Sequence, residues 1–375
     1  MAATLDVAAM DLTTTSGALT RELGLANRII SRKPTIPVLA NVLMQADAGL
    51  VTFTATDLEL ALRSTFPATV GRSGVRTVPA QKLHDLLRTL PDAEVRLVGD
   101  DKAVGLTAAG FRAKLQTLPA EDFPSVPSDA GVRMTSIPAR VLQALIPRVR
   151  FAASEDDKRY FMAGAHFEIK ADAVRMVATD SHRLALAEIK FDAKGALPPF
   201  TLLPKKTLDA LMAVLEDVDG DVACGRSEAH LFFATGTRMV ISRTIDGQFP
   251  AYERILPKDF KVAAVVPRAP LAEALRRATM VADTAAKKTT FALATGGLTV
   301  SARSAEVGDA DERVAFDYDG EEFSFSLNGG YVLDFLDAVG TDEVTLQAKG
   351  SNPAVMFSAV GGDVDYKYVV MPVIL

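Results

Sequence analysis

Three consecutive residues, Asp180, Ser181 and His182, are of the types that a hydrolase uses as acid, nucleophile and base. A catalytic relay requires these groups to lie within hydrogen-bonding distance of one another. Neighbouring residues of a β-strand point to opposite faces of the sheet, so these three cannot form a relay among themselves. We therefore expect no catalytic role for these three residues.

An acidic run at 217–228, DVDGDVACGRSE, places carboxylates at the first, third, fifth and twelfth positions of a calcium-binding loop. The sixth position of such a loop needs Gly for its sharp turn, but here it is Val222. A turn between strands is therefore the better interpretation. The histidines His84, His166 and His230 lack the spacing of metal ligands, and no Gly-rich phosphate-binding motif is present. We expect no metal and no cofactor.

The composition is that of a folded, acidic chain. Of its 375 residues 49% are hydrophobic and 23% are charged, and 41 Lys and Arg against 47 Asp and Glu give a net charge of −6. This balance excludes a disordered chain and a protein that binds nucleic acid or anionic lipid with its whole surface. The lone Cys224 permits no intrachain disulfide and suits a reducing cytoplasm. We expect neither a secretory signal nor a membrane span, because no apolar run is long enough.

The elements that must position any site occur three times along the chain. Three segments combine a tight turn with alternating residues, which is typical of a half-buried hairpin strand: 46–62, 171–186 and 294–308. Aligning Thr56, Thr179 and Ala302 gives steps of 123 residues. Three ordered copies account for nearly the whole length, so the sequence predicts an internal repeat.

Each copy also contains two segments with helical spacing of apolar residues. These six predicted helices are 17–33, 78–90, 138–154, 203–215, 267–283 and 327–339. Pro147 should kink or shorten the third of them. The order strand, helix, strands, helix, strands predicts an α+β fold in which two helices pack on antiparallel sheet. Linkers are expected near 123–137 and 249–266, each opened by a Phe-Pro pair that ends a strand.

The charge is distributed unevenly between the predicted helices and the rest of the chain. Five of the six helical segments are net positive and the last is net negative, whereas the remaining sequence is clearly acidic. Solvated helix faces often collect Lys and Arg, which is one explanation. The other is that the helices of all three copies share a surface that faces a polyanion.

Five segments in this order resemble the beta sliding clamp family of bacterial DNA polymerase III: TIPVLANVLM at 35–44, ATDLEL at 55–60, ATDSHRLAL at 178–186, DGQFPAYERILP at 246–257 and YVVMP at 368–372. The resemblance covers essentially the whole chain. It implies three clamp domains, at 1–128, 129–256 and 257–375, which form half of a head-to-tail dimeric ring lined by helices.

The resemblance also implies the function. Such a ring encircles duplex DNA without sequence specificity and tethers the replicative DNA polymerase, which confers processivity. It has no chemistry of its own, is loaded by an ATP-dependent clamp loader in the cytoplasm, and recruits further replication and repair proteins through short peptide motifs.

The resemblance implies three sets of site residues. The partner-peptide pocket between the second and third domains would be formed by Thr179, His182, Arg183, Leu184, Pro250, Arg254, Ile255, Val369, Met371 and Pro372. The DNA-facing residues would be Lys33, Lys82, Arg88, Lys205 and Lys206, to which the charge distribution alone adds Arg148, Arg150, Arg276 and Arg277. The dimer interface would place Arg112, Lys114 and Leu115 against Met280, Val281, Glu306, Asp309, Asp311 and Glu312.

The chain departs from the family pattern at a few of these places. Ser181 stands where the family usually has Gly, and Val373-Ile374 where it usually has Met-Arg. Asp156 replaces a neutral Gln that often contacts DNA, and Ala113 replaces an aromatic residue of the interface. Two other classes of function remain open at this point. One is an α+β enzyme with its site between domains, and the other is a ring-shaped scaffold that binds peptides but not DNA.

Overall fold

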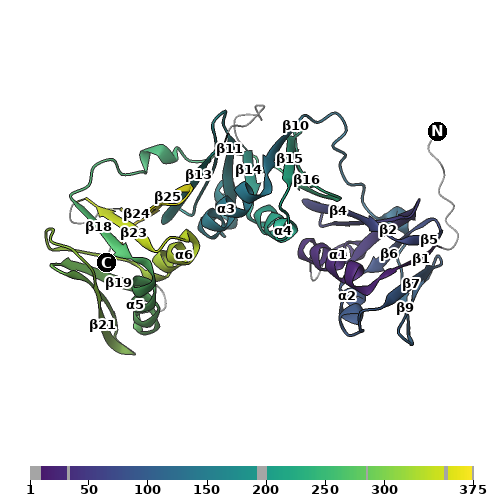
Figure 1. The fold of residues 1–375 in the computed structure, drawn as a ribbon, viewed down its shortest axis with the longest axis horizontal. Coiled ribbons are helices and arrows are strands. Elements are labelled where there is room, and N and C mark those ends of the chain that lie inside the picture. The colour runs from purple at the N-terminus through teal and green to yellow at the C-terminus, as the bar shows by residue number, and fades with distance from the viewer. Residues whose placement is uncertain (1–9, 32–33, 192–200, 284–285, 350–353, 374–375) are drawn as a thin grey trace. The chain divides into compact units, whose positions relative to one another are not determined.

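The computed structural model describes residues 10–31, 34–191, 201–283, 286–349 and 354–373, and one order of elements recurs in it three times. Each copy runs strand, helix, three-stranded meander, strand, helix, three-stranded meander, with one additional short strand in the first copy (Figure 1). The predicted α+β repeat is therefore confirmed.

The first copy begins with a capped helix. The Thr15 hydroxyl accepts a hydrogen bond from the backbone N–H of Ala18 (3.2 Å), which satisfies a free donor at the helix start. This helix ends at Ile29 and not at Lys33, four residues earlier than predicted, because the chain approaches Pro34, which cannot continue a helix. The elements are β1 (Met10–Thr15), α1 (Ser16–Ile29), η1 (Pro37–Ala40), β2 (Asn41–Asp47), β3 (Leu50–Thr56), β4 (Leu60–Pro67), β5 (Thr69–Arg72), β6 (Gly74–Pro79), α2 (Ala80–Arg88), β7 (Glu94–Gly99), β8 (Ala103–Ala108), β9 (Phe111–Gln116) and η2 (Ala120–Asp122).

The second copy shows the expected effect of Pro147. Its first helix ends at Val149, two residues after the proline, and a short 3-10 turn follows. The elements are β10 (Met134–Pro138), α3 (Ala139–Val149), η3 (Arg150–Ala152), η4 (Asp157–Met162), β11 (Gly164–Ile169), β12 (Ala173–Thr179), β13 (Arg183–Lys190), β14 (Thr201–Pro204), α4 (Lys205–Leu215), β15 (Asp221–Arg226), β16 (His230–Thr235), β17 (Arg238–Arg243) and η5 (Tyr252–Arg254).

The third copy has the clearest helix-end signals. The Asn328 side chain accepts from the backbone N–H groups of Gly330 and Tyr331, and Gly340 ends the same helix in the left-handed conformation (φ 76°). The elements are β18 (Val262–Pro267), α5 (Arg268–Val281), β19 (Lys288–Ala294), β20 (Gly297–Ser304), β21 (Gly308–Ala315), β22 (Phe323–Asn328), α6 (Gly329–Val339), β23 (Glu343–Ala348), β24 (Val355–Ala359) and β25 (Val364–Val370).

Strand exchange between the two halves of a copy places the strands of each copy in two antiparallel sheets, two of which are shared between neighbouring copies. The leading strand of each half pairs with the meander of the other half, as β1 does with β7 and β6 with β2. The four resulting sheets have the orders β5-β1-β7-β8-β9, β10-β15-β16-β17-β4-β3-β2-β6, β14-β11-β12-β13-β25-β24-β23-β18 and β21-β20-β19-β22. Helices α1 and α2 pack against each other and against strands of the first copy, and α5 and α6 do the same in the third copy.

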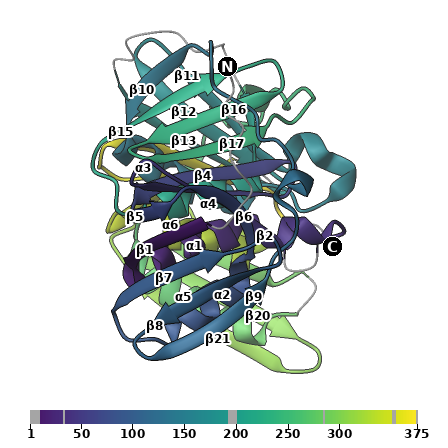
Figure 2. The same ribbon diagram turned by 90° about the vertical axis from the view of Figure 1, so that its right-hand side faces the viewer.

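Two of these sheets are long because they run from one copy into the next. Strand β17 pairs with β4, and β13 pairs with β25. By their contacts, residues 1–139 and 206–244 form one compact unit, and 140–205 and 245–375 form a second. Each long sheet lies within one unit. Figure 2 shows the sheet that contains β7, β8 and β9 in the first unit.

The connections between copies, at 117–133 and 244–261, begin and end earlier than the linkers predicted from the sequence. Strand β9 ends at Gln116 and β17 at Arg243, so Phe123 and Phe249 follow these strands by several residues and do not end them. Both phenylalanines are buried. No helix within the described residues is both long and apolar enough to cross a membrane.

Candidate partner-binding site

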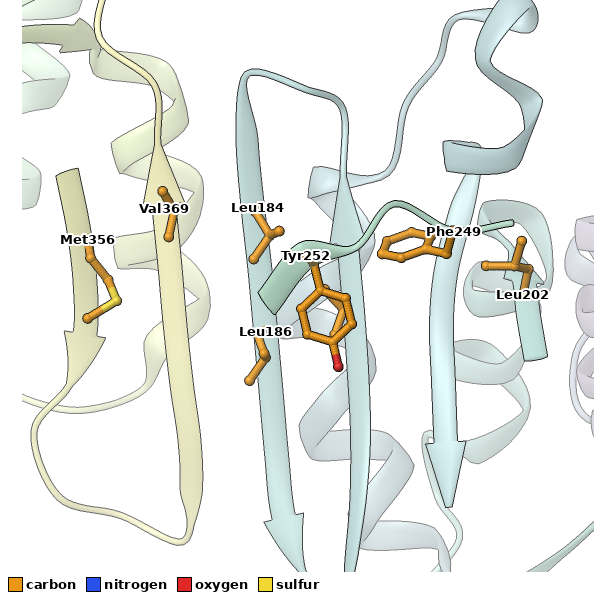
Figure 3. Close-up of a cluster of buried hydrophobic side chains, with 8 residues drawn as sticks. Leu184, Leu186, Leu202, Phe249, Tyr252, Met356 and Val369 are labelled. Atoms are coloured by element: carbon orange, nitrogen blue, oxygen red, sulfur yellow. The ribbon is translucent and has the colours of Figure 1, made fainter. Parts of the chain in front are cut away.

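A cluster of apolar side chains fills the place where the second copy meets the third. This junction cluster consists of Val177, Leu184, Leu186, Leu202, Phe249, Tyr252, Met356 and Val369 (Figure 3). Its members come from strands β12, β13, β14, β24 and β25 and from the connection that follows β17. Burial of these side chains stabilises the pairing of β13 with β25.

The strand register explains why these residues meet. Leu184 of β13 lies opposite Val369 of β25, which in turn lies opposite Met356 of β24. Side chains directly opposite in an antiparallel sheet share a face, so all three point to the same side. The half-buried Ile255 and Leu256 pack against this cluster from the connection and extend it to the protein surface.

The C-terminal segment continues the apolar edge beyond β25. The backbone N–H of Met371 donates to the carbonyl of His182 (2.8 Å), and that of Val373 donates to the carbonyl of Ser326 (3.0 Å). Met371 and Pro372 are half-buried, as is Pro250 in the connection, whereas His182 and Arg254 are exposed. Of the predicted pocket residues, Leu184, Ile255 and Val369 are thus brought together, with Met371 bonded to the turn that precedes Leu184.

The turn between β12 and β13 uses the polar groups that suggested a hydrolase. The Asp180 carboxylate accepts from the backbone N–H groups of His182 (2.9 Å) and Arg183 (3.0 Å), and the buried Thr179 hydroxyl donates to the carbonyl of Arg183 (2.7 Å). Ser181 has a φ of 78°, a conformation that favours Gly, which accounts for the family residue at this position. These groups shape a turn.

The side chain of Arg183, another predicted pocket residue, points away from the junction cluster. Its guanidinium donates to Asp334 on α6 (2.5 Å), to Asp180 (2.9 Å) and to the carbonyl of Phe151 (2.6 Å). Burial by itself lowers the pKa of Arg183, yet its electrostatic partners raise the pKa overall. Since neighbours on a strand point to opposite faces, Arg183 anchors the sheet to α6 on the side away from Leu184.

Among the predicted DNA-facing residues, Lys82 and Arg88 are exposed on α2, and neither has an acidic partner in the described part of the chain. Lys33 lies outside the described residues. On α4, Lys205 forms an ion pair with Glu155 (2.5 Å) and Lys206 with Asp57. The positive charge of α4 is therefore largely neutralised.

Most of the arginines that were added from the charge distribution already bind acidic side chains or backbone carbonyls. Arg276 pairs with Asp337 (2.5 Å), and Arg277 makes a bidentate pair with Glu312 (2.6 and 2.7 Å). Arg148 is half-buried and donates to the carbonyl at the end of α6, and burial lowers its pKa. The Arg148 guanidinium is therefore used inside the unit, and a DNA contact by Arg148 stays a prediction. Arg150 is half-buried.

Most of the residues predicted for a dimer interface lie on two sheet edges, whereas Met280 and Val281 lie at the end of α5. Within the described residues, β9 pairs only with β8, and β21 only with β20. Arg112 and Lys114 are exposed on β9, where Ala113 and Leu115 are half-buried. At the other edge Glu306, Asp309 and Asp311 are exposed, Val281 and Glu312 are half-buried, and Met280 is 79% exposed at the end of α5.

The interpretation of the acidic run as a turn between strands needs correction. Residues 221–226 of the acidic run form strand β15, so the predicted turn is instead a helix-to-strand connection followed by that strand. No group of three or more potential metal ligands occurs in the ranges that the structure describes. Sequence reasoning missed Tyr252 and Met356, and only the Phe-Pro repeat could have indicated the buried Phe249.

Three family models match successive parts of the chain. They describe the N-terminal domain (residues 10–127), the central domain (136–251) and the C-terminal domain (253–374) of the DNA polymerase III beta subunit. Together they cover nearly all of the sequence.

Individual relatives match over almost their full length. The Pseudomonas putida beta sliding clamp is 33% identical over 372 residues, covering 97% of this chain and 99% of that protein. A Caulobacter crescentus beta sliding clamp structure with bound PEG has a TM-score of 0.91 at 31% identity, covering 99% of this chain and 100% of the other. A Pseudomonas aeruginosa sliding clamp bound to griselimycin has a TM-score of 0.90 at 32% identity, covering 98% and 100%. The chain therefore belongs to the DNA polymerase III beta subunit family, the beta sliding clamps.

Proposed function

We propose that two copies of this chain close head to tail into a ring that surrounds duplex DNA and presents a partner-peptide pocket at the junction cluster. Family membership makes the chain a sliding clamp, which is a non-catalytic accessory subunit that gives a DNA polymerase its processivity. The proposal adds the assembly, the surfaces and the partners. The observation that carries it is the threefold repeat with an open sheet edge in its first copy and another in its last.

Closure through these two edges is supported by their charge. The β9 edge carries Arg112 and Lys114, and the β21 edge carries Asp309 and Asp311. Open edges tend to pair with another strand, and opposite charge favours pairing β9 of one chain with β21 of the other. A head-to-tail contact of this kind closes when it occurs twice.

Charge reversal tests this closure. A variant with Arg112→Glu and Lys114→Glu should sediment with the mass of one chain, and adding a second variant with Asp309→Lys and Asp311→Lys should restore a species of twice that mass. An unchanged dimer in the first variant would contradict the proposed interface.

Enclosure is the main means by which we expect the protein to hold DNA. The chain is acidic overall, and several helix cations are already paired, which leaves Lys82 and Arg88 as exposed charges on α2. A few weak phosphate contacts permit sliding, while the ring prevents escape. Because a closed ring has no free path onto DNA, we propose loading by an ATP-dependent loader, in the cytoplasm.

The pocket is proposed for short peptides of the polymerase and of other replication and repair proteins. A partly exposed apolar edge that includes Ile255, Met371 and Pro372 suits apolar anchors such as Leu and Phe, and Met adapts to different side chains. Griselimycin is bound in two structures of relatives, from P. aeruginosa and Bartonella birtlesii, and provides a second ligand for comparison.

The pocket is tested by two variants with opposite expectations. Ile255→Glu should weaken binding of a labelled hexapeptide with Leu and Phe anchors, measured by fluorescence anisotropy, and should leave DNA retention unchanged. Lys82→Glu should leave peptide binding unchanged and should weaken direct DNA binding measured by titration without a loader. Equal effects of both variants on both ligands would contradict the separation of the two surfaces, and peptide binding without any DNA retention would favour the scaffold alternative.

A further inference from the structure

The connection from the first copy to the second and the connection from the second copy to the third cross equivalent sheets. We call these two places the first and the second junction, and the first serves as an internal reference for the second. Thr56 and Thr179 end β3 and β12, and each hydroxyl donates to the carbonyl four residues later, Leu60 or Arg183. Counting along the paired strands from these two threonines makes Leu43, Gln45, Thr52 and Thr65 of the first copy equivalent to His166, Glu168, Arg175 and Glu188 of the second.

At the second junction these positions hold a charged network. The Arg175 guanidinium donates to Glu188 (Nε to Oε2, 2.5 Å) and to the hydroxyl of Tyr252 (Nη1, 2.9 Å). Glu168 lies 3.9 Å from Arg175 and 3.1 Å from His166. The network thus joins three strands of the sheet to the connection that passes over them.

Aromatic contacts hold the same connection at two further points. The His166 ring stacks on Phe249 with a centroid distance of 5.2 Å, and Phe249 and Tyr252 meet at 6.2 Å in an edge arrangement. Tyr252 is 3% exposed and belongs to the junction cluster, as Figure 3 shows. The backbone N–H of Ile255 donates to the carbonyl of Tyr252 (2.9 Å), so fixing Tyr252 also fixes the residue that forms the pocket wall.

The first junction lacks this arrangement. Thr52 and Thr65 share one neutral hydrogen bond (3.0 Å) where the second junction has Arg175 and Glu188. A cavity of about 580 Å³ lies between the sheet and the connection at 123–126, lined among others by Leu43 and Gln45. The side chains that would bind this connection to the sheet are absent from its equivalent positions.

We propose that Arg175 is a positioning residue for partner-peptide binding, because it holds Tyr252 and thereby keeps the wall at Phe249 and Ile255 in the conformation that a peptide requires. This inference rests on the proposed pocket. A site that is already ordered binds more tightly than one whose competent state is only partly populated. The contrast between the junctions identifies the second as the one prepared for a ligand.

The test measures the affinity of the full-length dimer for the labelled Leu- and Phe-containing hexapeptide. Arg175→Gln should weaken binding about tenfold and Tyr252→Phe about threefold, since each lowers the population of the ordered wall. Arg175→Lys, which keeps a positive charge beside Glu188, should recover part of the loss. The double variant should bind no worse than Arg175→Gln alone, because both substitutions remove the same interaction.

Two controls separate positioning from a loss of folding. Arg96→Gln removes a bidentate pair with Asp11 in the other compact unit and should leave peptide affinity unchanged. Hydrogen exchange of the Ile255 amide should be faster in Arg175→Gln. Exchange of the Met371 amide, which donates to the carbonyl of His182 in the turn before β13, should not change.

The outcomes distinguish this inference from the proposed function. If the unmodified protein fails to bind the peptide, the pocket itself is contradicted. If it binds and the Arg175 and Tyr252 variants bind equally well, or if their effects are additive, only the positioning role is overturned. A loss in Arg96→Gln equal to that in Arg175→Gln would also overturn it, because the effect would then be unspecific.

Discussion

Replacing Glu22 by Gln should loosen the contact between the first two copies of the repeat without altering either proposed binding surface. Glu22 projects from α1 and is only 3% exposed. Its carboxylate accepts from Arg238 of β17 (2.6 and 3.0 Å) and from the hydroxyl of Ser64 of β4 (2.5 Å). The ion pair thus links α1 to β17 next to the pairing of β4 with β17, which joins the first and second copies in one sheet.

The expected cost follows from what the substitution leaves behind. Gln keeps the size of the side chain but removes the charge that balances Arg238, whose side chain is 19% exposed. Removing one partner of a buried, hydrogen-bonded ion pair costs about 3–5 kcal/mol. We expect the lower end, about 3 kcal/mol, because Arg238 retains some access to solvent.

Native-state hydrogen exchange provides a local assay, which is needed because a chain of several domains does not unfold in one step. The amides of Thr65 and Arg243 bond across the strand pair, to Thr237 (3.0 Å) and Glu59 (2.8 Å). A loss of about 3 kcal/mol predicts more than hundredfold faster exchange at both. If hydrogen exchange accelerates by less than about threefold, the loss of stability is below 1 kcal/mol. That result would refute the stabilising role assigned to the ion pair of Glu22 with Arg238.

The same pair predicts how the effect depends on pH. Burial raises the pKa of Glu22, but the hydrogen bonds from Arg238 and Ser64 outweigh burial, so the pKa lies below its usual value. A carboxyl group with a lowered pKa stabilises the fold above its unfolded pKa, and this contribution is lost as the pH falls through the folded pKa. The difference between the protein and Glu22→Gln should therefore be full near neutral pH and should shrink in acid.

Three further predictions follow from individual residues. Ser181→Gly should raise the local free energy of opening of the turn between β12 and β13 by less than about 1 kcal/mol in native-state hydrogen exchange, because relief of the left-handed backbone outweighs the lost hydrogen bond from Arg159; a clear local destabilisation would contradict this. Lys82→Glu with Arg88→Glu should lower the slope of log affinity against log salt by about 1.8 in DNA-binding titrations, and an unchanged slope would remove both residues from the DNA surface. Cys224, whose thiol pKa is raised by burial, should resist alkylation until the protein unfolds, as mass spectrometry can show.

The repeat, the six helices and the α+β fold could be predicted because they depend on local patterns. Helical spacing marks α2 through Leu83 and Leu87, which are buried, and Pro147 shortens α3 as expected. The end of α1 was missed, since a helix terminus depends on weak local signals. The position of Phe123 after β9 was also missed, because a buried phenylalanine in a connection looks like the end of a strand.

The site residues also fall into two groups, those that local patterns could predict and those whose positions depend on partners distant in sequence. Leu184 and Val369 meet as expected because strand alternation places them on one face. Arg183 and Arg148 could not be placed, since the partners that occupy their guanidinium groups, Asp334 and the end of α6, are distant in sequence. Charge counting along a helix gives the sign of a segment but does not tell which charges are already paired.

Retention on circular and linear DNA tests the central claim, that the protein holds DNA by enclosing it. After incubation with a clamp loader and ATP, the protein should remain on nicked circular DNA through a wash at high salt, because screening weakens phosphate contacts but does not open a ring. It should slide off the same DNA once the circle is cut. Equal retention on both forms, or release from both by salt, would contradict the account.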